Sequence, residues 1–373
     1  MLNHSGPPYP SLREARAGEV GGGEVRSYTL ANAHGMTVEI LNLGGIIRRL
    51  EFPDRRGSVA NIVLGLPAID DYVERNPPPT ADKPQGAGLY FGALVGRFAN
   101  RLGGGRFEIE GQRYQVPANN GRNALHGGPA GFDQKLWEGE ALVASDVAGV
   151  RLSTVSPDGD MGFPGTLTTV ASYTLDNQNR LTLTLRASTD APTVVNLSNH
   201  TYWNLAGEAS GLIYDHVLYI NADGYTPVDE ELIPEGGISA VEGSAMDFRQ
   251  GRPIGEAIAE PERQLLIGRG YDHNWVLNRA GRERLTLAAS VFDPGSGRRL
   301  DVRTTQPGLQ FYSGNFLDGS VVGSGGRAYR QSAGLALETQ HFPDAPNQPL
   351  FPSTLLRPGE EYEHTTVYAL SCS

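Results

Sequence analysis

The chain has 373 residues, 48 glycines, 25 prolines and a formal net charge of −11. This length allows two average domains or one large all-β domain. The acidic balance argues against nucleic acid or an anionic membrane as a partner, because both require a basic surface.

Residues 1–24 are predicted to form a flexible N-terminal leader, because prolines stand at positions 7, 8 and 10 and glycines at 21–23. The first residues lack the basic start and the apolar run of a secretory signal. No apolar stretch along the chain is long enough to span a bilayer. The single cysteine, Cys372, cannot form a disulfide within the chain, which favours a cytoplasmic location.

The rest of the chain alternates between short runs of strand-forming residues and turn signals. We find no linker after residue 24, so residues 25–373 are predicted to form a single domain of class all-β, a large antiparallel β-sandwich. Specific expectations are strands at 151–155, 181–186, 217–220 and 365–370, a hairpin over 107–114 turning at Gly111, a short helix over 67–75 and a surface loop over 76–86.

Common cofactor and metal motifs are absent from the sequence. There is no Walker A sequence, no H-E-x-x-H, no Cys-x-x-Cys and no G-x-S-x-G. The G-x-G-x-x-A pattern at 323–328 has no following helix and reads as a loop. We therefore expect neither a metal nor an organic cofactor.

The most informative acid is Glu338, which ends the apolar run that starts at Leu335 and precedes the turn-rich loop 343–347. A carboxylate held by a strand beside a shaped loop is a candidate general base, although a strand-end Glu facing solvent is the common alternative. Further segments mix hydrogen-bonding side chains with aromatic and small residues, a combination that suits a neutral polyhydroxylated ligand. These segments are 96–101, 123–128, 196–204, 271–277 and 310–315.

At these residues the sequence resembles the aldose 1-epimerase (galactose mutarotase) family, from about residue 25 onward. The matching stretches include Gly96-Arg-Phe-Ala-Asn-Arg-Leu102, Leu125-His-Gly-Gly128, Asn199-His-Thr-Tyr-Trp-Asn-Leu-Ala-Gly207, Tyr271-Asp-His273, Gln310-Phe-Tyr-Ser-Gly-Asn-Phe316 and Leu337-Glu-Thr-Gln-His-Phe-Pro-Asp-Ala-Pro-Asn347. The resemblance implies the mutarotase-like supersandwich fold and the interconversion of α and β anomers of free hexoses such as galactose and glucose.

The resemblance also implies roles for individual residues. Glu338 falls at the position of the general base and His200 at that of the general acid. The family's sugar-positioning residues correspond to Asn100, Arg101, His126, Asp272 and Gln310. Among the aromatic residues of these segments, Tyr202 and Phe311 are candidates for stacking against the sugar ring.

Opening a ring hemiacetal requires a base that removes the C1 hydroxyl proton and an acid that protonates the ring oxygen. A carboxylate and an imidazolium meet this demand near neutral pH, so loss of either Glu338 or His200 should be severe.

Three alternatives stay open: a glycoside hydrolase or lyase, a non-catalytic sugar-binding protein on the same fold, and an epimerase of a phosphorylated or other sugar. The sequence does not choose among galactose, glucose, xylose and arabinose. The expected partner is a small monosaccharide, with the protein acting as a monomer or weak homodimer in the cytoplasm.

Overall fold

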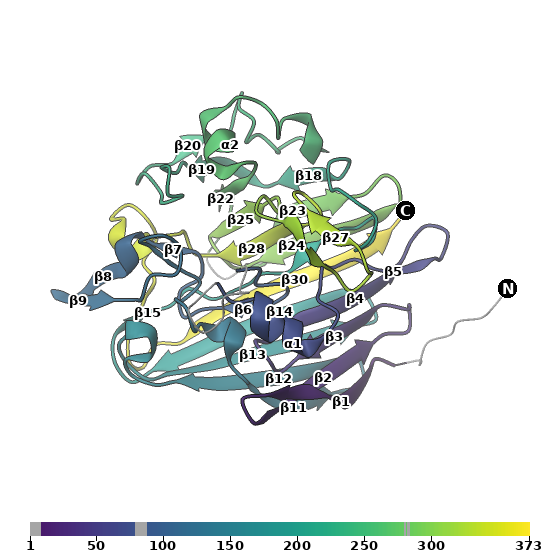
Figure 1. Ribbon diagram of the computed structural model, residues 1–373, viewed down its shortest axis with the longest axis horizontal. Helices are drawn as coiled ribbons and strands as arrows, with labels where there is room; N and C mark the ends of the chain where they lie inside the picture. Colours follow the sequence, from purple (N-terminus) through teal and green to yellow (C-terminus); the bar gives the residue numbers. More distant parts are fainter. Residues whose placement is uncertain (1–8, 79–87, 280, 282–283) are drawn as a thin grey trace.

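The computed structural model describes residues 9–78, 88–279, 281 and 284–373. Its strands form three large antiparallel sheets (Figure 1). The nine-stranded sheet has the order β11 (Glu138–Val143), β12 (Val147–Ser156), β13 (Leu167–Asp176), β14 (Arg180–Thr189), β30 (Tyr362–Cys372), β24 (Arg298–Thr304), β23 (Thr286–Phe292), β18 (Val217–Ile220) and β21 (Arg252–Pro253).

The six-stranded sheet carries most of the residues discussed below. Its order is β17 (Tyr202–Trp203), β28 (Leu335–Gln340), β25 (Gly308–Tyr312), β22 (Asp272–Leu277), β19 (Ala222–Thr226) and β20 (Ser239–Ala240). The five-stranded sheet runs in chain order through β1 (Ser11–Val20), β2 (Gly23–Ala31), β3 (Thr37–Leu41), β4 (Ile47–Pro53) and β5 (Val59–Asn61).

Small strand pairs and short helices connect these sheets. The pairs are β6 (Leu94–Val95) with β16 (Ser198–Asn199), β7 (Arg101–Leu102) with β10 (Ala124–Leu125), β8 (Arg106–Ile109) with β9 (Gln112–Gln115), β15 (Thr193–Val194) with β29 (Leu355–Leu356) and β26 (Asp318–Val322) with β27 (Ala328–Arg330). The α-helices of the described chain are α1 (Ile69–Arg75) and α2 (Arg263–Gly268), and its 3-10 turns are η1 (Gly103–Gly105), η2 (Phe132–Gln134), η3 (Asp160–Gly162), η4 (Ile254–Glu256) and η5 (Ala345–Asn347).

One continuous core joins the nine-stranded and six-stranded sheets and reaches from Tyr28 to Leu370. The inner face of the six-stranded sheet contributes Trp203, Trp275 and Phe311, all almost fully buried. The Trp203 ring lies 5.3 Å from the ring of Tyr368 on β30. Each such aromatic side chain stabilises the fold by about 1.5–3 kcal/mol through burial, so the core holds the six-stranded sheet rigidly in place.

The predicted strands, the hairpin at Gly111 and the short helix are confirmed, and the fold is the antiparallel β-sandwich expected. The loop predicted over 76–86 lies mostly outside the described residues. No helix in the described part of the chain is both long and apolar enough to cross a membrane.

The flexible leader predicted over residues 1–24 is wrong for its second half. Ser11–Val20 forms β1, which pairs along its length with β2. Gly21 and Gly22 have φ of 58° and 81°, so the glycine run is the tight turn of a β-hairpin rather than a linker. Residues 1–8 lie outside the described part of the chain.

Candidate active site

The two-residue period of β-strands places the functional side chains on one face of the six-stranded sheet. Glu338 lies directly opposite Gln310, and Tyr312 lies directly opposite Asp272. Their intervening neighbours point the other way and fill the core. The sheet therefore presents a row of polar and phenolic groups away from the core, on three adjacent strands.

Two turns lie opposite this polar face of the six-stranded sheet. His200 follows β16, where the Asn199 side chain accepts hydrogen bonds from the backbone nitrogen and the hydroxyl of Thr201 and so shapes the chain. His126 follows β10 and lies beside Asn100; both residues have left-handed φ angles, 52° and 64°. Non-glycine residues held in this region are common at functional sites, where the surrounding structure maintains the strain.

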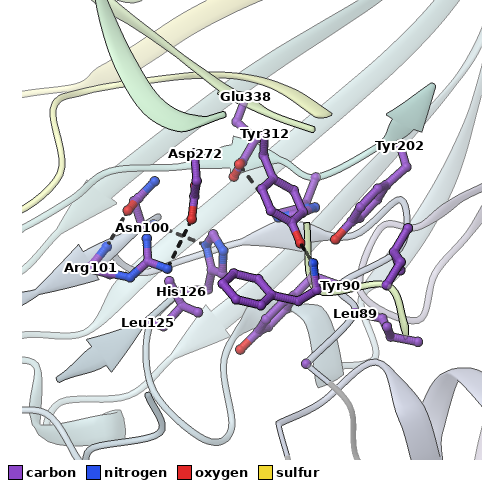
Figure 2. A pocket seen from close by; sticks show the side chains of 14 residues that line it. Leu89, Tyr90, Asn100, Arg101, Leu125, His126, Tyr202, Asp272, Tyr312 and Glu338 are labelled. Atoms are coloured by element: carbon purple, nitrogen blue, oxygen red, sulfur yellow. Dashed lines mark hydrogen bonds and ion pairs between the residues drawn. The ribbon is translucent and has the colours of Figure 1, made fainter. Parts of the chain in front are cut away.

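Together these elements line a partly open cavity on this side of the sheet. Figure 2 shows Asp272, Arg101 and Asn100 gathered on one side and Tyr202, Tyr312 and Tyr90 on the other. The lining residues are Gly88, Leu89, Tyr90, Asn100, Arg101, Leu125, His126, His200, Tyr202, Asp272, Tyr312, Phe316, Leu317 and Glu338. One wall offers hydrogen-bonding groups and the other offers apolar ring faces, which matches the two kinds of surface on a pyranose.

At the base of the cavity, the Nε2 atom of His200 lies 3.6 Å from Oε1 of Glu338. This separation exceeds a hydrogen bond, so an oxygen of a ligand can contact both groups. Burial raises the pKa of the Glu338 carboxyl well above its usual value, and the nearby charge of Asp272 adds to the rise. Burial lowers the pKa of His200 to about 4. Both shifts favour the neutral forms, so the burial of these two side chains opposes a charged pair.

Asp272 is held from two sides. Its Oδ2 lies 3.3 Å from a guanidinium nitrogen of Arg101, and its Oδ1 accepts a 2.7 Å hydrogen bond from the Gln310 amide. Arg101 also donates to the side-chain oxygen of Asn120 at 3.3 Å. Both side chains of this ion pair are buried, so each charge is stabilised in the protein interior by the opposite charge of its partner.

We therefore expect Arg101→Ala to destabilise the protein by about 3–5 kcal/mol and to raise KM, because it leaves the Asp272 carboxylate buried without its cation. Urea denaturation and initial rates over a range of sugar concentrations measure the two effects. Arg186→Ala, which breaks the exposed pair with Glu363, is the control and should cost about 1 kcal/mol or less. Equal stability of the two variants would contradict this view of the pair.

His126 has a fixed role as a hydrogen-bond donor. Its Nδ1 accepts a 3.1 Å hydrogen bond from the backbone N–H of Asn100, so the proton of the neutral ring sits on Nε2. Burial lowers its pKa well below the usual value, which keeps the ring neutral. His126, His200 and Glu338 each have a potential ligand atom within 4.8 Å of the others. Because Nε2 of His126 carries a proton, it presents a hydrogen-bond donor rather than a lone pair for a metal.

Seven of the nine residues predicted from the sequence line the cavity: Asn100, Arg101, His126, His200, Tyr202, Asp272 and Glu338. Gln310 is buried behind them and acts on Asp272. The prediction that Phe311 stacks on the sugar is wrong, because Phe311 lies on the core face of β25. Its ring is fully buried and stacks on Tyr271 at 5.0 Å.

Sequence reasoning missed several lining residues. Tyr312 could have been found, because it is two residues from Gln310 and shares its face of the strand. Tyr90 gave no such signal: it lies in a loop, with a φ of 51°, and its ring meets His126 edge-on at 4.6 Å. Phe316 and Leu317 follow β25 and reach the mouth of the cavity, where Phe316 is half exposed.

Comparisons with known proteins agree with this geometry. The family model described as aldose 1-epimerase matches residues 26–369. Galactose mutarotase of Rattus norvegicus is 44% identical over 351 residues, which cover 94% of this chain and 95% of the relative. Aldose 1-epimerase of Escherichia coli K12 is 38% identical over 359 residues, covering 96% and 98%. The crystal structure of galactose 1-epimerase from Lactobacillus acidophilus superposes with a TM-score of 0.83 at 30% identity, covering 97% and 99% of the two chains.

Proposed function

The chain belongs to the aldose 1-epimerase family, and we propose that Glu338 and His200 carry out the interconversion of the α and β anomers of free hexoses in the cavity described above. The family and the activity agree with those expected from the sequence. The observation that supports the two roles is the 3.6 Å separation of Nε2 and Oε1 in one cavity. Polarimetry tests the activity: the protein should accelerate the drift in rotation of freshly dissolved α-galactose and α-glucose.

The proposed reaction opens and recloses the sugar ring. Ionised Glu338 removes the proton from the C1 hydroxyl, while protonated His200 gives its proton to the ring oxygen, and the C1–O5 bond breaks to give the aldehyde. Rotation about C1–C2 presents the other carbonyl face. Closure returns the Glu338 proton to O1 and the ring-oxygen proton to His200. Glu338 and His200 together hold one proton in the charged form, on His200, and one in the neutral form, on Glu338. The cycle therefore consumes no protons.

Burial assists the ring-opening step in this scheme. Before opening, the two groups carry opposite charges; after it, both are neutral. The cavity raises the pKa of Glu338 and lowers that of His200, so it favours the neutral forms that ring opening produces. The His126 Nε2 proton and the Arg101–Asp272 pair supply fixed hydrogen bonds for the sugar hydroxyls throughout.

The rate should be flat across neutral pH, because the active pair holds a single proton over a wide range. Below about pH 4 the rate should fall, as His200 gains a proton while Glu338 keeps its own and no base is left. At alkaline pH it should fall again when Glu338 loses the last proton of the pair and no acid is left. Polarimetry with the buffer-catalysed rate subtracted measures this profile. An acid limb near the ordinary histidine value of about 6.5 would contradict it.

The contacts of Asp272 and Arg101 weigh against two alternatives. A glycoside hydrolase needs a second carboxylate free to act, but both oxygens of Asp272 are engaged by Arg101 and Gln310. A phosphosugar epimerase needs spare positive charge, yet Arg101 is the arginine among the described lining residues and it is paired with Asp272. We expect no new reducing ends from an oligosaccharide and slower turnover of glucose 6-phosphate than of glucose. A sugar-binding protein would leave the rotation rate unchanged.

We also infer that the protein works as a monomer or weak homodimer in the cytoplasm. The residues that we assign to the site all come from one chain, so a second copy is not needed to complete it. The free Cys372 thiol suits a reducing compartment. Light scattering at several protein concentrations tests the first inference, and a panel of galactose, glucose, xylose and arabinose measures the sugar preference.

A further inference from the structure

A buried carboxylate and a buried phenol, Glu208 and Tyr329, form a pair that the proposed reaction does not use. Glu208 is 7% exposed and lies in the loop that follows β17, while Tyr329 is 2% exposed and lies on β27. The Tyr329 hydroxyl donates a hydrogen bond to Oε1 of Glu208, and the backbone N–H of Gly325 donates a second one at 3.1 Å. Burying a carboxylate is costly, and an apolar pair of the same size would fill the core as well, so the pair is best explained by the segments that it holds in place.

The turn between β26 and β27 closes around this carboxylate. It contains the G-x-G-x-x-A pattern at 323–328, which forms a loop as the sequence predicts. A Cβ atom on Gly323 would collide with the Tyr329 hydroxyl and with Oε1 of Glu208, and a Cβ atom on Gly325 would collide with Oε2. Glycine at these two positions therefore allows the backbone to approach the carboxylate closely.

The Tyr329 hydroxyl also holds the backbone of Gly65. It accepts a 3.0 Å hydrogen bond from the N–H of Gly65, and it lies 2.9 Å from the carbonyl oxygen of the same residue. That carbonyl already accepts a 3.0 Å hydrogen bond from the N–H of Ser324. Because a carboxylate is also the stronger acceptor, we assign the single phenolic proton to the bond with Glu208. The hydroxyl thus links the carboxylate to the segment that follows β5.

Two routes of contact lead from Tyr329 to Tyr202 in the cavity. The backbone route runs through Leu64, the residue before Gly65, whose N–H donates a 2.9 Å hydrogen bond to the carbonyl of Tyr202. The side-chain route runs through Phe91: its ring meets that of Tyr329 edge-on at 5.5 Å and that of Tyr202 edge-on at 4.9 Å. The three rings belong to one buried apolar cluster. Both the backbone and the ring of Tyr202 are therefore held from the side of Tyr329.

We propose that Glu208 and Tyr329 are positioning residues for Tyr202 and that they set the affinity for the sugar by fixing the aromatic side of the cavity. Tyr202 lines the cavity beside Tyr312, with 5.8 Å between the centres of the two rings (Figure 2). A displaced Tyr202 ring would lose its contact with the C–H groups of the sugar, so binding should weaken more than the proton transfers slow. This role rests on the proposed function, in which Tyr202 contacts the bound sugar.

Tyr329→Phe tests the proposal, because it removes the hydroxyl and keeps the ring. We expect the Kd for galactose, measured by isothermal titration calorimetry, to rise about fivefold, as for the loss of one hydrogen bond of typical net strength. In polarimetry KM should rise by a similar factor, while kcat changes less than about twofold. A loss of stability alone would lower the folded fraction, and so the apparent kcat, without changing Kd or KM.

The same substitution in a Tyr202→Leu background shows whether Tyr329 acts through Tyr202. If it does, adding Tyr329→Phe should leave the Kd of the Tyr202→Leu protein unchanged, because the ring that the hydroxyl positions is already gone. A Kd that rises equally in both backgrounds would overturn the proposal. A folded Tyr329→Phe protein with the Kd and KM of the unchanged protein would overturn it as well.

Two variants of Glu208 test the other half of the pair and decide the question if Tyr329→Phe does not fold. Glu208→Gln keeps a side-chain oxygen that can accept from Tyr329 and Gly325, so its Kd should stay within about twofold of that of the unchanged protein. Glu208→Ala loses this acceptor and should raise the Kd as Tyr329→Phe does. Equal Kd values for the two Glu208 variants would contradict the proposal.

Asn32→Ala is the control for losing a buried polar group. Asn32 is 1% exposed and joins the turn after β2 to the turn after β13 by donating to Asp176 and Asn179, and none of the three is among the described residues that line the cavity. The change should lower the melting temperature and leave the Kd unaltered; a rise in Kd like that of Tyr329→Phe would overturn the proposal. Because Kd does not depend on turnover, a protein that binds galactose without accelerating mutarotation would refute the proposed function and still leave the positioning roles open to this test.

Discussion

Glu338→Gln is expected to lower kcat about a thousandfold while the protein stays folded, within the range that one general acid or base contributes. The substitution keeps the shape of the side chain and removes the ability to accept the C1 proton. The Oε1 position beside His200 is then occupied by a group that cannot change its protonation state. Polarimetry on α-galactose measures the loss.

The same variant should be more stable than the unchanged protein at neutral pH. Burial raises the folded-state pKa of Glu338 above the ordinary value of 4.5. The contribution of the Glu338 proton to the free energy of unfolding is therefore complete below pH 4.5, and it is lost as the pH rises toward the folded-state pKa. Glutamine has no such pH dependence. We expect a gain of about 1.4 kcal/mol per unit of pKa shift, visible at pH 8 and absent near pH 4.

Glu363→Gln is the control for removing a carboxylate. Glu363 is exposed and pairs with Arg186 on the outer surface, so the change should leave kcat and the melting temperature nearly unaltered. If Glu338→Gln kept more than a tenth of the activity, Glu338 would not be the base.

His200→Asn is expected to lower kcat by about a hundred- to ten-thousand-fold, because asparagine cannot deliver a proton to the ring oxygen. The acid limb near pH 4 should also disappear from the residual rate, since the group that titrates there is gone. KM should change less than kcat, because Asn100, Arg101 and Asp272, which we propose orient the sugar, are unchanged.

A second histidine shows whether the effect is specific. His364 on β30 is part-buried and bonds to the Thr305 hydroxyl at 3.1 Å, outside the cavity. His364→Asn should therefore keep the wild-type rate. Activity in His200→Asn equal to that of His364→Asn would remove His200 from the mechanism.

The sequence predicts the sheets well because strand alternation is a local signal. The strands at 151–155 and 181–186, for example, fall within β12 and β14. The site residues are predicted because ordered motifs far apart in the chain match one family. The alternation of β25 also separates Tyr312 from Phe311, a distinction that the prediction of stacking aromatics did not use.

Other features depend on contacts that no local pattern contains. Gln310 reaches Asp272 rather than the cavity because β22 and β25 pair in a particular register. Tyr90 enters the cavity through a loop of unusual φ. The glycines at 21–23 give the same signal in a flexible leader and in a hairpin turn, and only the pairing of β1 with β2 distinguishes them. The protonation of His126 depends on one backbone N–H, that of Asn100.

The most direct measurement is a crystal structure of the Glu338→Gln protein with galactose bound. A proton acceptor and a proton donor that share one substrate must both touch its reacting atoms. The sugar O1 should lie within about 3.2 Å of the side chain at position 338, and the ring O5 should lie equally close to His200 Nε2. A sugar bound in this cavity with O1 and O5 both turned away from these two side chains would contradict the mechanism.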